Sequence, residues 1–145
     1  MRHTELYRQQ HATIAELIRK LEQSLDVAKL QQSTMQVWHL LAELSGQIVV
    51  HLSGEDRWLY PELRSCGDPQ AQAVARAFSE EMGHIAGAFK AYTERWLMPS
   101  AIASEPQAFI EQTREIAQTL QQRMRREHAE LYALADRLHA AAKSA

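Results

Sequence analysis

The sequence lacks the features that several protein classes require. Cys66 is its only cysteine, which excludes an internal disulfide and a cysteine-rich zinc site. Its 16 basic and 18 acidic residues nearly cancel, without a run of five like charges, so no nucleic-acid partner is predicted. No apolar run approaches the roughly 18 residues of a membrane span, and the N-terminus does not resemble a secretory signal. We therefore expect a cytoplasmic protein with no membrane partner, whose ligands bind through nitrogen and oxygen.

Glycine and proline are also few, at 5 and 4 residues, and they occur singly along the sequence. The residues between them are mostly good helix formers, and no alternating strand pattern appears. Four helices with short connections are predicted, over residues 4–29, 33–66, 68–97 and 104–141. A chain of this length fits a single domain, residues 1–145. The predicted fold class is all-α, an antiparallel up-down-up-down four-helix bundle.

Capping residues support the predicted helix starts. A side-chain oxygen at the N-cap accepts a hydrogen bond from one of the first, otherwise unpaired, backbone N–H groups of a helix. Three such starts are predicted, from the capping-box pairs Ser33 with Gln36 and Ser104 with Gln107, and from Asp68 followed by Pro69.

Polar residues interrupt the predicted buried faces of three helices. His11 lies in the apolar stripe of the first helix, His51 and Glu55 in that of the second, and Glu127 in that of the fourth. Burying an unpaired carboxylate costs several kcal/mol, so these positions require protons, counter-charges or a metal ion, and a divalent ion meets the requirement best. His84 lies about a third of a turn from the stripe of the third helix and could reach inward from that flank.

Each of these histidines also has an ordinary interpretation. A single histidine on an apolar face is usually a core imidazole bonded to a backbone carbonyl, and His51 with Glu55 could form a buried hydrogen-bonded pair. Together, however, the donors would fill one core layer from four helices, as His11, His51, Glu55, His84 and Glu127. An internal repeat favours this combined interpretation. His11 precedes Glu55 by 44 residues and His84 precedes Glu127 by 43, while EDRWLYPEL from Glu55 aligns without a gap to EHAELYALA from Glu127.

With these motifs the sequence resembles the hemerythrin-like, or HHE cation-binding, family of four-helix bundles. The resemblance rests on QQHATI around His11, HLSGEDRWLYPEL from His51, MGHI at His84 and REHAELY around Glu127. It implies that each half supplies one histidine from its first helix and a histidine and a glutamate from its second, together holding two iron ions. The ligands so implied are His11, His51, Glu55, His84 and Glu127.

The sequence departs from the family pattern where the sixth ligand is expected. Residue 123 is arginine, a permanently charged donor that cannot ligate a metal. Three interpretations remain: His128 ligates after a small rotation of the fourth helix, one metal position is incomplete and filled by water or a ligand, or Arg123 replaces the second cation by pairing with Glu127 or Glu55. Ala88 stands where oxygen-carrying hemerythrins would place another histidine, so a dedicated oxygen store is not implied.

The donor set of imidazoles and carboxylates suits iron, with zinc or manganese as alternatives. The leading hypothesis is a non-haem iron protein, with two ions or one, that binds O2, NO or a peroxide for sensing, storage or stress response. His3 is a reserve ligand. The alternative is a helical interaction module with an incomplete or structural metal site, whose partner is a second copy or another protein. Enzymatic activity stays open, since no nucleophile and base pair, phosphate loop or dinucleotide fingerprint appears.

Overall fold

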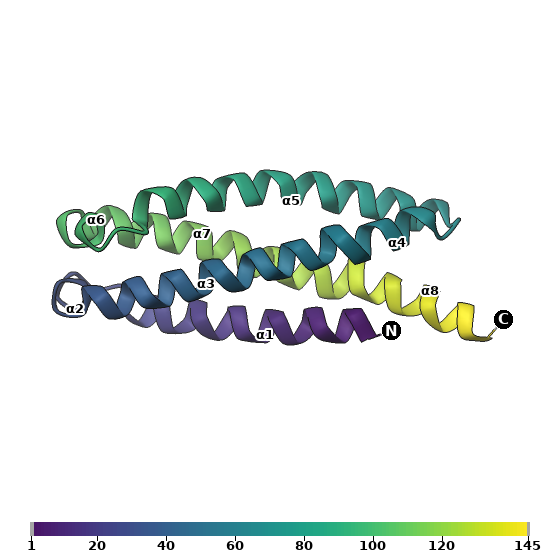
Figure 1. Cartoon of the computed structure of the whole chain (residues 1–145), viewed down its shortest axis with the longest axis horizontal. Coiled ribbons are helices and arrows are strands. Elements are labelled where there is room, and N and C mark those ends of the chain that lie inside the picture. Colours follow the sequence, from purple (N-terminus) through teal and green to yellow (C-terminus); the bar gives the residue numbers. More distant parts are fainter. Residues whose placement is uncertain (1, 145) are drawn as a thin grey trace.

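The computed structural model describes the backbone of residues 2–144 and the side chains of residues 4–142. Within that part of the chain every regular element is helical and no strand is present, so the predicted all-α class is confirmed. Figure 1 shows long helical rods side by side, with successive rods running in opposite directions and both termini toward the same end. None of the described helices has the length and apolar character needed to cross a bilayer.

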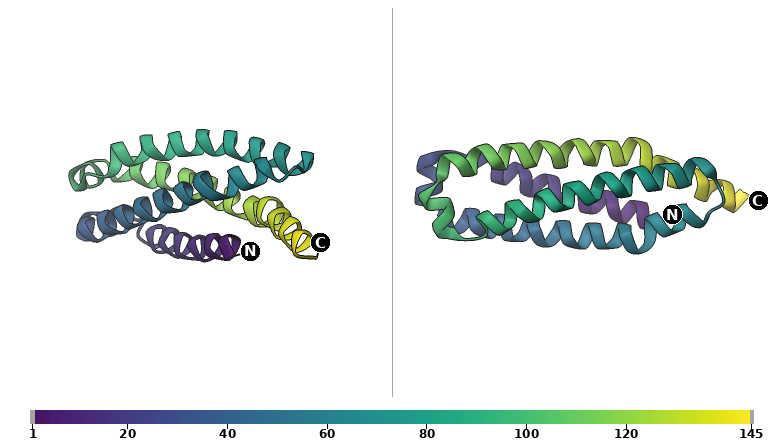
Figure 2. Two further views of the ribbon diagram at one scale, coloured as in Figure 1. Left: turned by 45° about the vertical axis from the view of Figure 1, so that its right-hand side comes forward. Right: turned by 90° about the horizontal axis from the view of Figure 1, so that it is seen from above.

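The long rods are partly composite, because π-helical segments and short end helices interrupt the regular α-helix. The elements are α1 (Arg2–Gln23), α2 (Val27–Gln32), α3 (Thr34–Gly54), η1 (Glu55–Leu59), α4 (Tyr60–Ser65), α5 (Pro69–Trp96), α6 (Pro99–Ser104), α7 (Pro106–Arg126), η2 (Glu127–Tyr132) and α8 (Ala133–Ser144). α3, η1 and α4 form one rod, and α7, η2 and α8 form another. The short helices α2 and α6 lie at the end of the molecule away from the termini (Figures 1 and 2).

The first helix is shorter than the sequence predicted. It ends at Gln23 instead of continuing to Lys29, because Asp26 starts a new helix. The Asp26 side chain accepts a hydrogen bond from the backbone N–H of Lys29 at 3.1 Å. An aspartate that caps the backbone in this way competes with continuation of the helix.

The structure also tests the three helix starts that were predicted from capping residues. The Asp68 start of α5 is confirmed, since its side chain accepts from the N–H of Gln70 at 2.8 Å. The start at Ser33 is confirmed too, because Ser33 is the N-cap of α3, but its side chain makes no capping hydrogen bond. The predicted start at Ser104 was wrong, because Ser104 ends α6 and α7 begins at Pro106.

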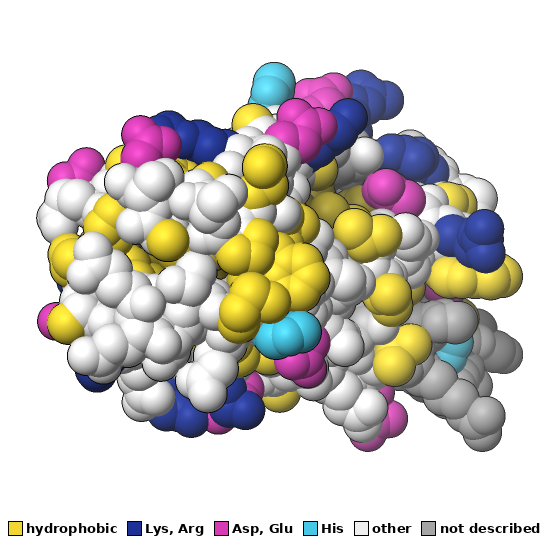
Figure 3. Space-filling model, turned by 60° about the vertical axis from the view of Figure 1, so that its left-hand side comes forward, with side chains coloured by type: hydrophobic (Ala, Val, Ile, Leu, Met, Phe, Trp, Pro, Cys, Tyr) yellow, Lys and Arg dark blue, Asp and Glu magenta, His cyan; other side chains and the backbone are white. Residues whose placement is uncertain are grey.

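The apolar core consists of two clusters. The distal cluster, which includes Ile18, Leu41 and Trp96, fills the end that carries α2 and α6. The terminal cluster, which includes Tyr7 and Leu63, fills the end near the chain termini. Buried polar residues of α1, α3, η1, α7 and η2 lie between the two clusters. On the face seen in Figure 3, acidic and basic side chains are interspersed around a gathering of apolar ones, in keeping with the balanced net charge.

Both π-helical segments begin at a glutamate of the internal repeat, Glu55 in η1 and Glu127 in η2. A π-helix bonds residue i to residue i+5, and such segments occur mostly at functional sites. In an α-helix, residues five apart point about 140° away from each other. Here Glu55 and Tyr60 are both buried, and so are Glu127 and Tyr132. The π turns therefore allow a glutamate and the tyrosine five residues later to share the interior.

Candidate metal centre

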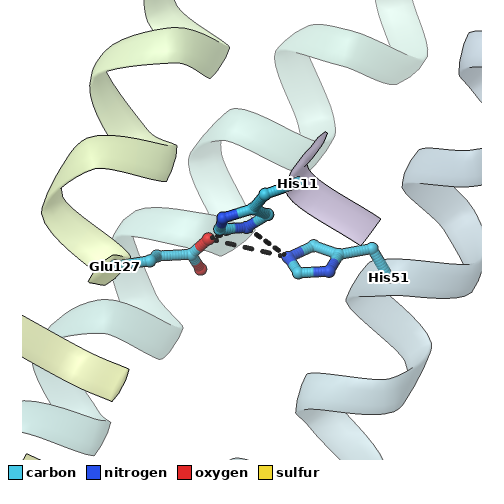
Figure 4. Close-up of side chains that lie close together, drawn as sticks. All are labelled: His11, His51 and Glu127. Carbon is cyan, nitrogen blue, oxygen red and sulfur yellow. Dashed lines mark hydrogen bonds and ion pairs between the residues drawn. The ribbon is translucent and has the colours of Figure 1, made fainter. Parts of the chain in front are cut away.

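Two histidines and a glutamate form a buried group of potential metal donors. His11 of α1, His51 of α3 and Glu127 of η2 each offer one ligand atom, and these atoms all lie within 4.8 Å of one another. The Nε2 atom of His11 is 3.0 Å from Nε2 of His51 and 2.8 Å from Oε1 of Glu127. Figure 4 shows these side chains converging from three different rods. The group occupies the polar layer between the distal and terminal clusters.

Glu55 and Tyr132 complete this layer. Glu55 is fully buried, with Oε1 lying 3.3 Å from Nε2 of His51, and its Oε2 accepts a hydrogen bond from the Tyr132 hydroxyl at 2.7 Å. The same hydroxyl is 3.2 Å from Nε2 of His11 and 3.4 Å from Oε1 of Glu127. Burial raises the pKa of Tyr132, so the phenol keeps its proton and acts as the donor to Glu55.

The outer nitrogens of both histidines also have partners. Nδ1 of His51 lies 2.8 Å from the side-chain oxygen of Gln10, and Nδ1 of His11 lies 2.8 Å from Nε2 of His128. Because an amide oxygen only accepts, Nδ1 of His51 is the donor in the first contact. Partners of this kind orient metal-binding imidazoles and direct the other ring nitrogen toward the ion. Both Nε2 atoms accordingly face the donor group.

The charges of this layer perturb one another strongly. Burial opposes the protonated form of His51, but hydrogen bonds and charge from Glu127 and Glu55 outweigh it and raise its pKa to about 9. Burial raises the pKa of Glu55 to about 7. Glu127 is buried too, yet hydrogen bonds from His11 and His51 and the charge of Arg123 hold its pKa below the ordinary range. The layer therefore favours positive charge, which either protons or a metal ion supplies.

Two carboxylate oxygens test whether a metal ion fits here. Oε1 of Glu55 and Oε2 of Glu127 are buried without a hydrogen-bond partner. Their cationic neighbours, His51 and Arg123, lie at an ion-pair distance of 3.3 Å. Oε2 of Glu127 faces Arg123, whereas Oε1 of Glu55 and Oε1 of Glu127 lie beside the two imidazole Nε2 atoms. These two oxygens and two nitrogens make a donor set suited to a divalent first-row ion. The donor set thus fits one such ion.

Comparison with known proteins agrees with this geometry. The sequence model of the family described as Hemerythrin HHE cation binding domain matches residues 2–143, nearly the whole chain. The chain belongs to the hemerythrin HHE cation-binding family. The resemblance inferred from the sequence is confirmed, and the family's description makes this HHE domain a cation-binding one. No curated protein and no solved structure matches the chain significantly.

His84 does not reach the donor layer of this HHE domain. It is exposed on α5, as are Ala77 and Ala88 on the same flank of the helix. Met82, two residues earlier and about 200° around the helix, faces the core instead. The structure therefore does not bring His84 together with the other predicted donors, because the large apolar side chains of α5 determine which face is buried. His3 lies outside the residues whose side chains are described.

Arg123 and His128 are placed on opposite sides of the HHE domain's fourth rod. Arg123 is only 3% exposed, while His128 is exposed and contacts the outer nitrogen of His11. The nitrogen of His128 that makes this contact thus lies behind His11, outside the group of donor atoms. The guanidinium makes an ion pair with Glu127 at 3.3 Å and another with Glu81 at 3.0 Å. Of the three interpretations of residue 123, pairing between the arginine and Glu127 is the one that the geometry favours.

Two spaces adjoin the donors of the HHE domain. A small internal cavity of about 20 Å³ is lined mainly by apolar residues and by the donors themselves, namely His11, Ile14, Ile48, His51, Leu52, Met82, Leu120, Arg123, Met124 and Glu127. An open groove of about 760 Å³ lies between α1 and the α7–η2 rod. His11 and Met124 line both spaces and therefore form the partition between them.

Proposed function

We propose that this HHE domain holds a non-haem iron centre at which it binds a small ligand, O2, NO or a peroxide. The observation that carries the proposal is the buried convergence of His11, His51 and Glu127, with Glu55 beside them. A mixed set of imidazoles and carboxylates suits iron, and zinc or manganese are the alternatives. Bound iron would supply the coordination position for the ligand. The chain's own residues supply the donors, orient them and exclude bulk water.

The internal cavity supports the choice of ligand. Its volume of about 20 Å³ exceeds the roughly 10–15 Å³ needed to hold one water molecule and is far below the roughly 300 Å³ of a pocket for an organic molecule. Its lining is apolar apart from the donors and Arg123. A diatomic molecule or a peroxide suits such a space, whereas an organic substrate does not. Sensing, storage and stress response are the roles that fit reversible binding of this kind.

The proposal also concerns the setting of the centre. The rods are taken as the antiparallel up-down-up-down four-helix bundle of the family, in a cytoplasmic protein. In this arrangement each half of the repeat contributes one π-helical segment to the donor layer, which is consistent with Glu55 and Glu127 lying on opposite rods.

Metal analysis of purified variants tests the proposal. After anaerobic loading with ferrous iron and desalting, we expect the wild-type chain to retain iron. We expect His51→Ala to bind iron at least about 100-fold more weakly. Losing a residue that only orients a metal ligand already weakens metal binding by about 10- to 100-fold, and His51 is proposed as a ligand itself. His39→Ala is the matched control, because His39 lies on the same helix but is exposed. NO titration followed by EPR then tests ligand binding. A wild-type chain that folds but retains no iron, zinc or manganese would overturn the proposal in favour of a metal-free interaction module.

A further inference from the structure

We infer that Arg123 takes the place of the second metal ion, so that this chain holds one ion where the family plan implies two. The inference rests on the proposed metal binding and concerns the number of ions. Its basis is the internal repeat, which relates the two halves of the donor layer residue by residue.

The tyrosines of the repeat show that Arg123 is structurally equivalent to His51. Tyr132, five residues after Glu127, places its hydroxyl 3.5 Å from Nε2 of His51 in the other half. Tyr60, five residues after Glu55, places its hydroxyl 3.0 Å from Nη2 of Arg123. Each tyrosine thus crosses to the residue that precedes the opposite glutamate by four positions. The guanidinium occupies the place that an imidazole nitrogen occupies in the first half.

The first helix of each half also contributes a partner to the residue that precedes the glutamate by four positions. In the first half, Nε2 of His11 lies 3.0 Å from Nε2 of His51. In the second half, Glu81 of α5 faces Arg123, with Oε1 accepting a hydrogen bond from Nη1 at 3.0 Å. Glu81 thus lies beside Arg123 as His11 lies beside His51. Two histidines that face each other in the first half thus correspond to an acid and a base that pair in the second half.

The contacts of Arg123 leave no room for an ion beside Glu127 in the second half. Nε of Arg123 lies 3.3 Å from Oε2 of Glu127, and Nη2 donates a hydrogen bond to the backbone carbonyl of Phe78 at 2.9 Å. The guanidinium carbon, Cζ, lies 4.5 Å from the centre of the Phe78 ring. Carboxylate oxygens hold first-row metal ions at about 2.0–2.2 Å. A second ion on Oε2 would therefore need the space that the buried guanidinium fills.

Charge balance leads to the same conclusion. Arginine does not lose its proton in proteins, so its positive charge is permanent. Arg126 also pairs with Glu81, so the charge of Arg123 is available to Glu127, one of the two buried carboxylates. A second divalent ion would add like charge next to the guanidinium. A single ion among His11, His51 and the two glutamates meets the remaining demand.

Counting the ions tests this inference. The wild-type chain, Arg123→Lys and Arg123→His are loaded with ferrous iron anaerobically, desalted, and analysed for iron per chain. We expect one ion in the wild type and one in Arg123→Lys, which keeps the charge. Arg123→His removes the charge and introduces, four residues before Glu127, the imidazole that His51 provides before Glu55. We expect this variant to hold two ions, and EPR of the NO-treated ferrous proteins to give a mononuclear signal for the wild type.

The outcomes are distinguishable. Two ions in the wild type, or one ion in a folded Arg123→His protein, would overturn the inference while leaving the proposed metal binding intact. No metal in the wild type would overturn the proposed function and the inference with it. If Arg123→His does not fold, the wild-type ion count and its EPR signal still decide.

Discussion

The Nε2 atom of His128 lies 2.8 Å from Nδ1 of His11, the ring nitrogen opposite the one that contacts Glu127. In the proposed metal centre, this contact would orient His11 as a donor. Outer partners of metal-binding histidines are worth about 10- to 100-fold in metal affinity, so we expect His128→Ala to weaken iron binding by that factor. His128→Gln, whose amide oxygen accepts a hydrogen bond, should recover much of the loss. Competition with a chelator of known affinity measures both variants.

His84→Ala tests whether His84 is a metal ligand, as the family pattern implies, or lies outside the donor layer, as the structure places it. His84 is exposed on α5 and lies outside the donor layer, so we expect the variant to retain the wild-type iron content and affinity. His51→Ala, in the same assay, provides the scale of a lost donor. A loss of iron in His84→Ala as large as that in His51→Ala would show that α5 turns this side chain inward when metal binds.

The Tyr132 hydroxyl is expected to contribute to both stability and metal binding. Tyr132→Phe leaves Oε2 of buried Glu55 without its 2.7 Å hydrogen bond, which should lower the free energy of unfolding by about 1–3 kcal/mol. Tyr92→Phe is the matched control, since the Tyr92 hydroxyl makes a buried 2.6 Å contact with Thr113 in the distal cluster. Urea unfolding should show similar losses for both variants, but only Tyr132→Phe should change iron affinity. Equal iron affinities would exclude a role of this hydroxyl in the centre.

Asp136 makes the stability of the terminal end depend on pH. Burial would raise the pKa of Asp136, but hydrogen bonds from Thr4 at 2.6 Å and Arg8 at 2.7 Å outweigh it and lower the pKa. The stabilisation is therefore fully present above the unfolded pKa of about 3.9 and is lost as the pH falls through the lower folded value.

Asp136→Asn removes this titration. In the variant, we expect the free energy of unfolding, measured in urea between pH 6 and pH 3, to fall less steeply toward acid than in the wild type. Glu43→Gln is the control, because Glu43 is an exposed carboxylate on α3. Parallel pH curves for the wild type and Asp136→Asn would contradict the assignment.

Met124 is expected to control how fast a ligand reaches the internal cavity. It is shared by the outer groove and the cavity, and its flexible side chain is half-buried between them. Met124→Phe should slow the association of NO with the ferrous protein, and Met124→Ala should accelerate it, as measured by stopped flow. Met82→Leu, which changes only the cavity wall, should leave the association rate closer to that of the wild type. Identical rates in both Met124 variants would point to another route.

Helical periodicity predicted the buried positions of the donors well. His11, His51, Glu55 and Glu127 interrupt apolar stripes in the sequence, and all four are buried in the structure. Large apolar side chains on either side of each residue define the face, so a spacing of three and four residues is sufficient. That these residues ligate a metal remains a prediction.

Periodicity was less informative at the edges of a stripe. In the sequence of the fourth helix, Met124 falls within the apolar stripe and Arg123 and His128 flank it on opposite sides. In the structure, Arg123 is buried and Met124 is only half-buried. Rotating the helix about its axis by roughly 100°, the angle of one residue, decides which of these side chains is buried. The residues on other rods that pair with the guanidinium determine this rotation. Glu81, a distant residue of α5, is one of those partners.

Tyr132 shows a different limit of the sequence pattern. A residue five positions after Glu127 would point about 140° away on an α-helix, so periodicity excludes it from the donor layer. The alignment of LY in both halves of the repeat was the available signal. Pro61, which lacks an N–H group, gives a local reason for the π turn of the first half, but Ala133 holds the corresponding place in the second.

The two π-helical segments also have a consequence for chain length. A π turn takes up one residue more than an α turn, so every side chain beyond it is shifted in phase by about 100° relative to continuous α-helix. Leu63 and Ala135, each eight residues after its glutamate, belong to the terminal cluster with this phase. Deleting one residue from η1 or η2 and closing the turn as α-helix would place these side chains seven residues after the glutamate, about 20° from its direction, so they would still face the core. Deleting one residue from the regular α-helix beyond the turn would instead rotate the following side chains by about 100°. Within each rod, the π turn is thus the place where the chain can lose a residue and keep its terminal cluster.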